Sequence, residues 1–133
     1  MGITIVWDNS DHTVMRMTFT SPWNWDDLET ILTEVHAMLD TVNHRVDVIV
    51  DMKNSGAIPE GAFWRFHKLT QTKHRNRGRV ILVGGNTFIR TMTDTVRRLA
   101  NDLFDADMFV LAPTVEDARA VLFKKRLEMA NSF

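Results

Sequence analysis

The sequence predicts a single α/β domain with a mixed β-sheet, and three observations support this prediction. The 133 residues fit one domain, and an apolar fraction of 44% is enough to form a hydrophobic core. Short β-prone runs alternate with longer segments that carry apolar residues at helical spacing, in the order ββαβαβαβα. Each later strand follows a helix, so we expect these strands to be parallel, with right-handed crossovers.

The first three elements are predicted from strand alternation, a turn signal and an apolar stripe. Residues 3–7 alternate and residues 14–19 form a second β-prone run, with turn-forming residues at 9–11, which predicts an opening hairpin. Asn24 is placed to cap the next helix, and acidic residues fill its first turn. The buried face of that helix is predicted from Leu28, Ile31, Leu32, Val35, Met38 and Leu39.

Three further strands and three further helices complete the predicted order. The strands are expected at residues 46–50, 80–83 and 108–111, and the helices at residues 59–73, 88–103 and from 113 onwards. The run 80–83 is apolar throughout, as expected for a central strand that is buried on both faces. Thr114 and Asp117 have the spacing of a capping box at the start of the last helix.

Composition restricts both the class of protein and its chemistry. The chain has no cysteine, which excludes disulfides, thiolate ligands and cysteine nucleophiles. No apolar run approaches the roughly 20 residues that span a bilayer, so no integral membrane segment is expected. The first residues lack the basic start and the cleavage site of a signal peptide, so we expect a cytoplasmic protein.

The net charge of −1 hides an uneven distribution of charge. Residues 1–51 hold nine acidic and two basic side chains, whereas residues 65–79 hold six basic side chains and no acidic one. Such a basic segment marks an anion or nucleic-acid surface in some proteins and a solvated helix end in others. Because the near-zero total charge gives little long-range attraction to DNA, we favour the helix end and expect no nucleic-acid partner.

The candidate functional site is the segment that follows the predicted strand 46–50. Its polar residues are Asp51, Lys53, Asn54 and Ser55. In α/β folds, ligands and partners tend to bind where a strand ends and the chain turns toward a helix. Asp51 is either a functional carboxylate or a residue that caps the loop by accepting backbone N–H groups. Ser55 is either a phosphorylation site or an ordinary turn residue, and we favour the turn residue.

Two aromatic residues, Phe63 and Trp64, extend the candidate site onto the start of the helix 59–73. Adjacent residues on a helix point in different directions, so if Phe63 is in the core, Trp64 leans outward. An outward Trp64 is a good interface anchor. The alternative is a half-buried Trp64 at the margin between helix and sheet.

The sequence contains none of the common signatures of catalysis, nucleotide binding or metal binding. Residues 84–86 (Gly-Gly-Asn) follow a strand, but they lack the glycine pattern of dinucleotide sites and the Gly-Lys-Ser/Thr of P-loops, so a tight turn is favoured. The five histidines show no metal-ligand spacing. There is no Gly-x-Ser-x-Gly motif. We therefore predict no catalytic residue, no metal and no cofactor.

Five segments of the chain carry a family resemblance. They are SPWNWDDL (21–28), VIVDM (48–52), PEGAF (59–63), RVILVGGNTF (79–88) and LAPTVEDARAVL (111–122). Together they resemble the STAS and SpoIIAA-like family, the domains related to bacterial anti-sigma-factor antagonists and to the cytoplasmic domains of sulfate transporters. The resemblance implies a mixed sheet with helices largely on one face, and a function in binding.

Antagonists of that family bind a kinase-like anti-sigma factor and are switched by phosphorylation. The phosphorylated serine lies at the start of the second helix, in an Asp-Ser-Ser-Gly-like context after the third strand. Asp51 matches the acidic residue of that context. Here, however, residues 52–54 separate it from Ser55, so the sequence departs from the switch pattern.

The leading hypothesis is a non-enzymatic regulatory or interaction domain that binds a protein partner through residues 51–64. An alternative is a module that binds a small apolar or anionic ligand, such as a lipid, between the helix 59–73 and the sheet, supported by Met52, Phe63 and Phe66. A third reading is a phosphorylation-switched antagonist. A homodimer is expected, through the edges of the short opening and closing strands and an exposed Trp64.

Overall fold

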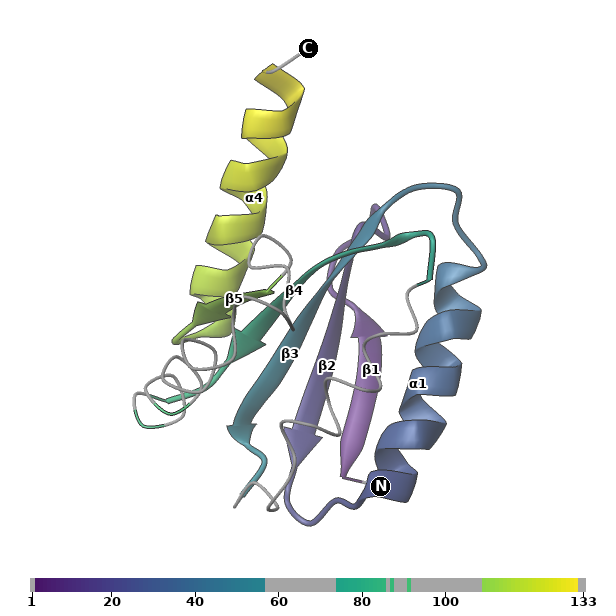
Figure 1. The fold of residues 1–133 in the computed structure, drawn as a ribbon, viewed down its shortest axis with the longest axis vertical. Helices are drawn as coiled ribbons and strands as arrows, with labels where there is room; N and C mark the ends of the chain where they lie inside the picture. Colours follow the sequence, from purple (N-terminus) through teal and green to yellow (C-terminus); the bar gives the residue numbers. More distant parts are fainter. Residues whose placement is uncertain (1, 57–73, 86, 88–90, 92–108, 132–133) are drawn as a thin grey trace, which may run out of the picture.

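The computed structural model describes residues 2–56, 74–85, 87, 91 and 109–131 (Figure 1). The strands are β1 (Ile3–Trp7), β2 (Val14–Thr20), β3 (Val46–Asn54), β4 (Arg77–Val83) and β5 (Phe109–Ala112), and the helices are α1 (Trp25–Leu39) and α4 (Val115–Asn131). The two other helices that the sequence predicts, over 59–73 and 88–103, fall outside these residues.

The strands form one mixed sheet in the order β1-β2-β3-β4-β5. The first pair is antiparallel and the remaining three pairs are parallel. The predicted α/β class, the opening hairpin and the mixed sheet are therefore confirmed. The turn of the hairpin is closed by Asn9, whose side-chain oxygen accepts hydrogen bonds from the backbone N–H groups of Thr13 and Val14 at 3.0 and 3.2 Å.

Helix α1 begins where the sequence predicts, because its capping residues are local. The Asn24 side chain accepts a hydrogen bond from Asp27 N at 2.9 Å, and the Asp27 carboxylate accepts one from Asn24 N at 3.1 Å, which completes a capping box. One face of the helix is buried: Leu28, Ile31, Val35 and Leu39. This face packs on apolar residues of β1, β2 and β3.

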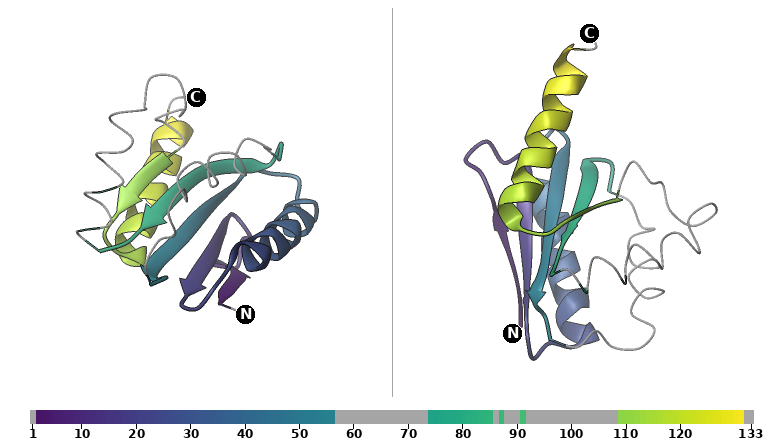
Figure 2. Two further views of the ribbon diagram at one scale, coloured as in Figure 1. Left: turned by 60° about the horizontal axis from the view of Figure 1, so that its bottom comes forward. Right: turned by 90° about the vertical axis from the view of Figure 1, so that its left-hand side faces the viewer.

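The two described helices pack on opposite faces of the sheet (Figure 2). Along β3, Val48 and Val50 belong to the core cluster of α1, whereas Ile49 belongs to the cluster that includes Ala118 and Leu122 of α4. This alternation buries β3 on both sides, as the prediction of parallel central strands requires. These two helices do not support the placement of helices largely on one face, which the family resemblance implies.

Strand β3 is longer than the sequence analysis predicts. The prediction ended the strand at residues 50–51, where the side chains become polar. In the structure β3 continues to Asn54, because β2 also extends to Thr20 and supplies backbone partners for it. Strand pairing satisfies backbone groups whatever the side chains are, so the change in polarity did not mark the end of the strand.

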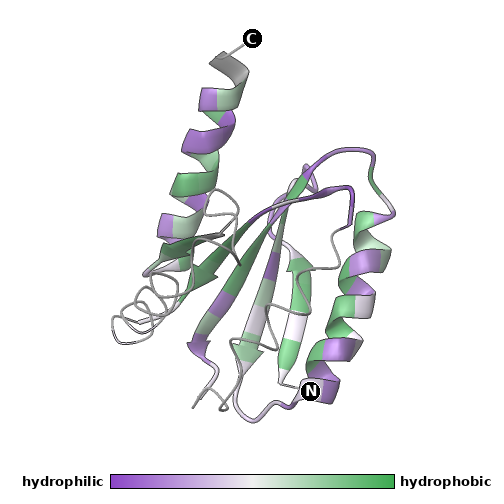
Figure 3. Ribbon diagram, in the orientation of Figure 1, coloured by the Kyte–Doolittle hydropathy of each residue, from purple (hydrophilic) through white to green (hydrophobic). Residues whose placement is uncertain are grey.

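Figure 3 shows hydrophobic residues concentrated in the strands, whereas α4 carries hydrophobic and hydrophilic bands along its length. Neither α1 nor α4, the helices that the structure describes, is long and apolar enough to cross a membrane.

The burial pattern makes a prediction about stability. Ile49 is fully buried between the sheet and α4, so Ile49→Ala is expected to lower the free energy of unfolding by about 2–5 kcal/mol. Val6 lies on β1 with 43% of its surface exposed, and Val6→Ala is expected to change it by less than about 0.5 kcal/mol. Urea unfolding followed by circular dichroism measures both. Similar losses for the two variants would contradict the assigned core.

Candidate functional site

The predicted site residues Asp51, Lys53 and Asn54 lie on the last part of β3 rather than in a loop. The Asp51 carboxylate accepts a hydrogen bond from Lys53 N at 3.0 Å, which is the capping role that the sequence analysis gave as its second reading. Lys53 and Asn54 are exposed. The strand end therefore offers the polar side chains of Lys53 and Asn54 to solvent. Phe63 and Trp64 lie outside the residues that the structure describes.

Ser55 is buried, with only 4% of its surface exposed. Its hydroxyl donates a hydrogen bond to Met52 O at 2.9 Å, and its own carbonyl accepts one from Trp23 Nε1 at the same distance. These bonds fasten the end of β3 to the segment that precedes α1. A kinase reaches the hydroxyl only if both contacts open, so the geometry favours the reading of Ser55 as a turn residue.

An open groove of about 500 Å³ lies beside this strand end. It is lined by Gly2, Thr20, Ser21, Pro22, Trp23, Asn24 and Asp27. The Asp27 carboxylate and the Asn24 amide are engaged with each other in the capping box, and the Trp23 indole donates to Ser55. Of the predicted site residues that the structure describes, none lines the groove.

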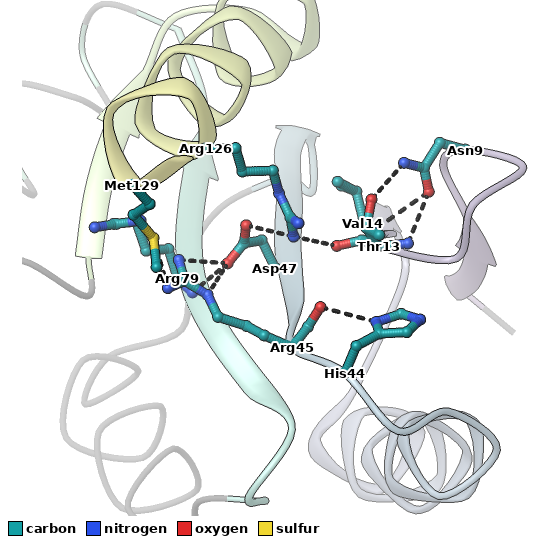
Figure 4. Close-up of polar contacts among 9 residues, drawn as sticks. All are labelled: Asn9, Thr13, Val14, His44, Arg45, Asp47, Arg79, Arg126 and Met129. Atoms are coloured by element: carbon teal, nitrogen blue, oxygen red, sulfur yellow. Dashed lines mark hydrogen bonds and ion pairs between the residues drawn. The ribbon is translucent and has the colours of Figure 1, made fainter. Parts of the chain in front are cut away.

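A second site surrounds the fully buried carboxylate of Asp47, which the sequence analysis missed (Figure 4). Asp47 Oδ1 accepts hydrogen bonds from Arg45 Nε and Nη2, both at 3.2 Å, and from Arg79 N at 2.7 Å. Asp47 Oδ2 accepts one from Arg126 Nη2 at 3.0 Å. The carboxylate thereby joins β3, β4 and α4. We call Arg45, Asp47, Arg79 and Arg126 the arginine cluster.

The backbone of β4 is shaped to fit this carboxylate. Beside Asp47 the pairing of β3 with β4 is irregular, and β4 places two residues, Gly78 and Arg79, opposite it. The irregularity directs the Arg79 N–H at the carboxylate. It also brings β4 so close that a Cβ on Gly78 would overlap Asp47 Oδ1 and Arg45 Nε. Only glycine fits this position without displacing the cluster.

Arg126 and Arg45 extend the cluster to neighbouring elements. Arg126 Nη2 also donates to Thr13 O at 2.9 Å, just before β2, and Arg45 Nη1 makes a contact of 3.3 Å with the sulfur of Met129 on α4. The C-terminal half of α4 is therefore held to the ends of β2 and β3 where these strands begin. The predicted site lies at the other end of β3, where the strand finishes.

The arginine cluster has more positive than negative charge. Arg45 and Arg126 share one carboxylate, and their side chains are still 35% and 37% exposed. Strand alternation places the charged side chain of Arg79 on the same face of the sheet as Asp47. Burial lowers the pKa of Arg77, which begins β4. Within the described part of the chain, Arg79 Nε and Nη1 and Arg126 Nε are buried without a hydrogen-bond acceptor. The cluster thus retains donors and positive charge that Asp47 does not satisfy.

Asp8 forms a smaller ion-pair group at the other end of α4. Its carboxylate accepts two hydrogen bonds from Arg119, each of 2.8 Å, and one from Arg16 Nε at 3.0 Å. The bonds from Arg119 lower the pKa of Asp8 in spite of the opposing effect of burial, and Arg16 adds to the lowering. The same pair raises the pKa of Arg119. The start of α4 is thus tied to the hairpin.

The described residues contain no group of three or more His, Cys, Asp or Glu side chains able to hold a metal ion. Among these residues, His74 Nε2 lies 2.6 Å from Asp40 Oδ1, and its ring packs edge-on against that of His36. Asn76 N donates to His74 Nδ1 at 3.1 Å, so both ring nitrogens already have partners.

The sequence did contain a signal for the arginine cluster. Asp47 is a lone acid inside an apolar strand, and a charge buried there needs partners. One of the partners of Asp47, Arg79, belongs to the basic segment 65–79. Its bases Arg77 and Arg79 were assigned to a helix end, but both lie in β4, and the backbone N–H of Arg79 donates to Asp47.

No family model, no curated protein and no solved structure matches this chain. The resemblance to STAS and SpoIIAA-like domains therefore stays a hypothesis that rests on the sequence segments alone.

The close approach at Gly78 can be tested against a second glycine. Gly78→Ala is expected to lower the free energy of unfolding by about 3 kcal/mol, since the new methyl group overlaps buried polar atoms. Gly85→Ala is the control, because a Cβ there meets nothing within 4 Å, and its expected change is no more than about 1 kcal/mol. Urea unfolding measures both, and equal effects would argue against the tight fit.

The Asp8 group predicts how stability depends on pH. Since the pKa of Asp8 is lowered in the folded state, its contribution is complete above the unfolded value of about 3.9 and is lost as the pH falls through the folded value. Melting temperatures between pH 7 and pH 2 should therefore fall less steeply in Arg119→Gln than in the unmodified protein. Arg75→Gln, which removes an exposed positive charge outside this group, is expected to keep the original profile.

Proposed function

We propose that the chain is a non-enzymatic interaction domain that acts by protein–protein contact, and that a second copy of the chain binds to α4. The observation that carries this proposal is the outward face of the helix. Phe123 and Leu127 are one turn apart on α4, and 67% and 48% of their surfaces are exposed. Large apolar side chains at this spacing form a continuous contact surface.

Helix α4 is apolar on two faces, which distinguishes it from a helix that only covers a sheet. Ala118 and Leu122 are buried against the sheet. A helix with one packing surface has polar residues opposite. Here the opposite face carries Ala120, Phe123 and Leu127, separated by three and four residues as in the seam of a coiled coil. We call these three residues the α4 stripe.

The charges beside the α4 stripe favour an antiparallel pair of helices. When two copies of α4 pair antiparallel so that Ala120 meets Phe123 of the partner, Asp117 on one helix lies near Lys124 on the other, twice by symmetry. A parallel pair would instead bring Arg119 near Lys124, which repel. In the antiparallel pair the other flank contains Arg119 and Arg126, which Asp8 and Asp47 already neutralise in part.

This proposal moves the main contact away from the surface expected from the sequence. Contact through Asp51, Lys53, Asn54 and the aromatic pair Phe63 and Trp64 stays a prediction. The burial of Ser55 supports an interaction domain that does not depend on phosphorylation at that residue.

Sedimentation velocity at 5–200 µM, roughly the range in which modest interfaces associate, tests the proposal. We expect a dimer for the unmodified protein and a monomer for Phe123→Glu, because a charge replaces the centre of the stripe. Val6→Glu, at an exposed apolar position on β1, is the matched control and should remain dimeric. A monomer throughout the range, or equal effects of the two variants, would contradict the assigned surface.

A charge-reversal pair tests the orientation. Asp117→Lys should weaken the dimer several-fold, and the addition of Lys124→Asp should restore it, since the two positions exchange signs across the interface. If the double variant is weaker than the single one, the helices do not pair antiparallel in this register.

A further inference from the structure

The surplus of positive charge in the arginine cluster requires an explanation that the folding of the sheet does not give. One carboxylate is enough to hold one or two guanidinium groups, and Asp47 binds those of Arg45 and Arg126 (Figure 4). It also accepts a hydrogen bond from the backbone N–H of Arg79, whose charged side chain lies on the same face of the sheet. Asp47 offsets one of the three positive charges. Two charges are left at an edge of the sheet where Arg45 and Arg126 are partly open to solvent.

Some hydrogen-bond donors of the cluster have acceptors and others have none. Arg79 contributes its backbone N–H to Asp47, but its side-chain Nε and Nη1 are buried without an acceptor in the described part of the chain, as is Arg126 Nε. Strand alternation places the Arg79 side chain on the same face as Ile81, the face on which α4 packs. Buried donors without acceptors are rare and destabilising, and the oxygens of a bound anion would satisfy them.

We propose that Arg45, Arg79 and Arg126 form a binding site for a phosphate-type oxyanion at this edge of the sheet. A doubly charged phosphate monoester matches the two uncompensated charges. Its several oxygens match the planar donor forks of arginine, which bind phosphate in pairs of hydrogen bonds. Asp47 contributes by fixing Arg45 and Arg126 in place, so that little side-chain freedom remains to be lost on binding.

The size and charge of the cluster favour a single phosphate group over a nucleic acid. A duplex presents a row of phosphates and is bound by an extended basic surface. The cluster is compact, and the chain as a whole has a net charge of −1. The phosphate belongs either to a small soluble molecule or to a lipid headgroup, since both present the same chemistry.

Arg79→Gln is the informative variant, because the contact of residue 79 with Asp47 is made by the backbone and is retained. We expect inorganic phosphate, compared with chloride at equal ionic strength, to raise the melting temperature of the unmodified protein by about 5 °C at ten times the dissociation constant. In Arg79→Gln the rise should be lost. Without phosphate this variant should be as stable as the unmodified protein or more so, since two unsatisfied donors are removed.

The control is Arg75→Gln, which removes an exposed arginine just before β4 and should keep the full response to phosphate. An equal rise in Arg79→Gln and the unmodified protein would mean a general salt effect and would overturn the proposal. The proposal also fails if phosphate does not raise the melting temperature of the unmodified protein. It fails as well if Arg79→Gln is strongly destabilised without phosphate, because the Arg79 side chain then stabilises the fold rather than binding an anion.

Vesicle flotation separates the two sources of phosphate. Vesicles with phosphatidic acid present a phosphate monoester, and vesicles with phosphatidylglycerol present a diester at a similar surface charge. If the protein floats only with phosphatidic acid vesicles, and Arg79→Gln does not float with them, the phosphate belongs to a lipid headgroup. A melting response to phosphate without flotation supports a soluble phosphate compound. Equal flotation with both, unchanged in Arg79→Gln, contradicts a specific site.

Discussion

The buried carboxylate of Asp47 is the interaction on which the arrangement of β3, β4 and α4 depends. A charge without solvent is strongly unfavourable unless it is paired and hydrogen-bonded, and Asp47 accepts four hydrogen bonds from three arginine residues. Those bonds exist only with Gly78 at the irregular point of β4, and with α4 placed so that Arg126 reaches the sheet. Arg45 and Asp47 at the start of β3 therefore act as one structural unit with Gly78 and Arg79 of β4.

The parts of the fold that were predicted correctly are those fixed by neighbouring residues. Asn24 and Asp27 cap α1 over three residues of sequence, and the buried stripe of α1 repeats at helical spacing. The end of β3 was predicted wrongly because it depends on β2, which lies more than thirty residues away in the chain. Strand length is a property of the pair, and side-chain polarity along one strand does not report it.

The same distinction explains the outcome for the candidate site. The capping role of Asp51 is local, and it was among the readings that the sequence offered. The burial of Ser55 depends on Trp23, and the role of Arg79 depends on Asp47, and each of these partners is 32 residues away. A lone aspartate in an apolar strand indicates that partners exist, but it does not say which arginines they are. The residues of the α4 stripe are present in the sequence, but only the structure shows that Phe123 and Leu127 stay exposed after folding.

Helix α4 is held to the rest of the molecule by Arg119 at Asp8 and by Arg126 at Asp47, and these two arginines are seven residues apart. Seven residues are nearly two turns, so the two attachments lie along almost one line of the helix surface, about 10 Å apart. Together with the burial of Ala118 and Leu122 against the sheet, these two attachments fix the rotation of the helix about its axis. They thereby set the direction in which Phe123 and Leu127 point. Both carboxylates are almost inaccessible to solvent, so salt in solution screens these attachments less than it screens pairs of exposed charges.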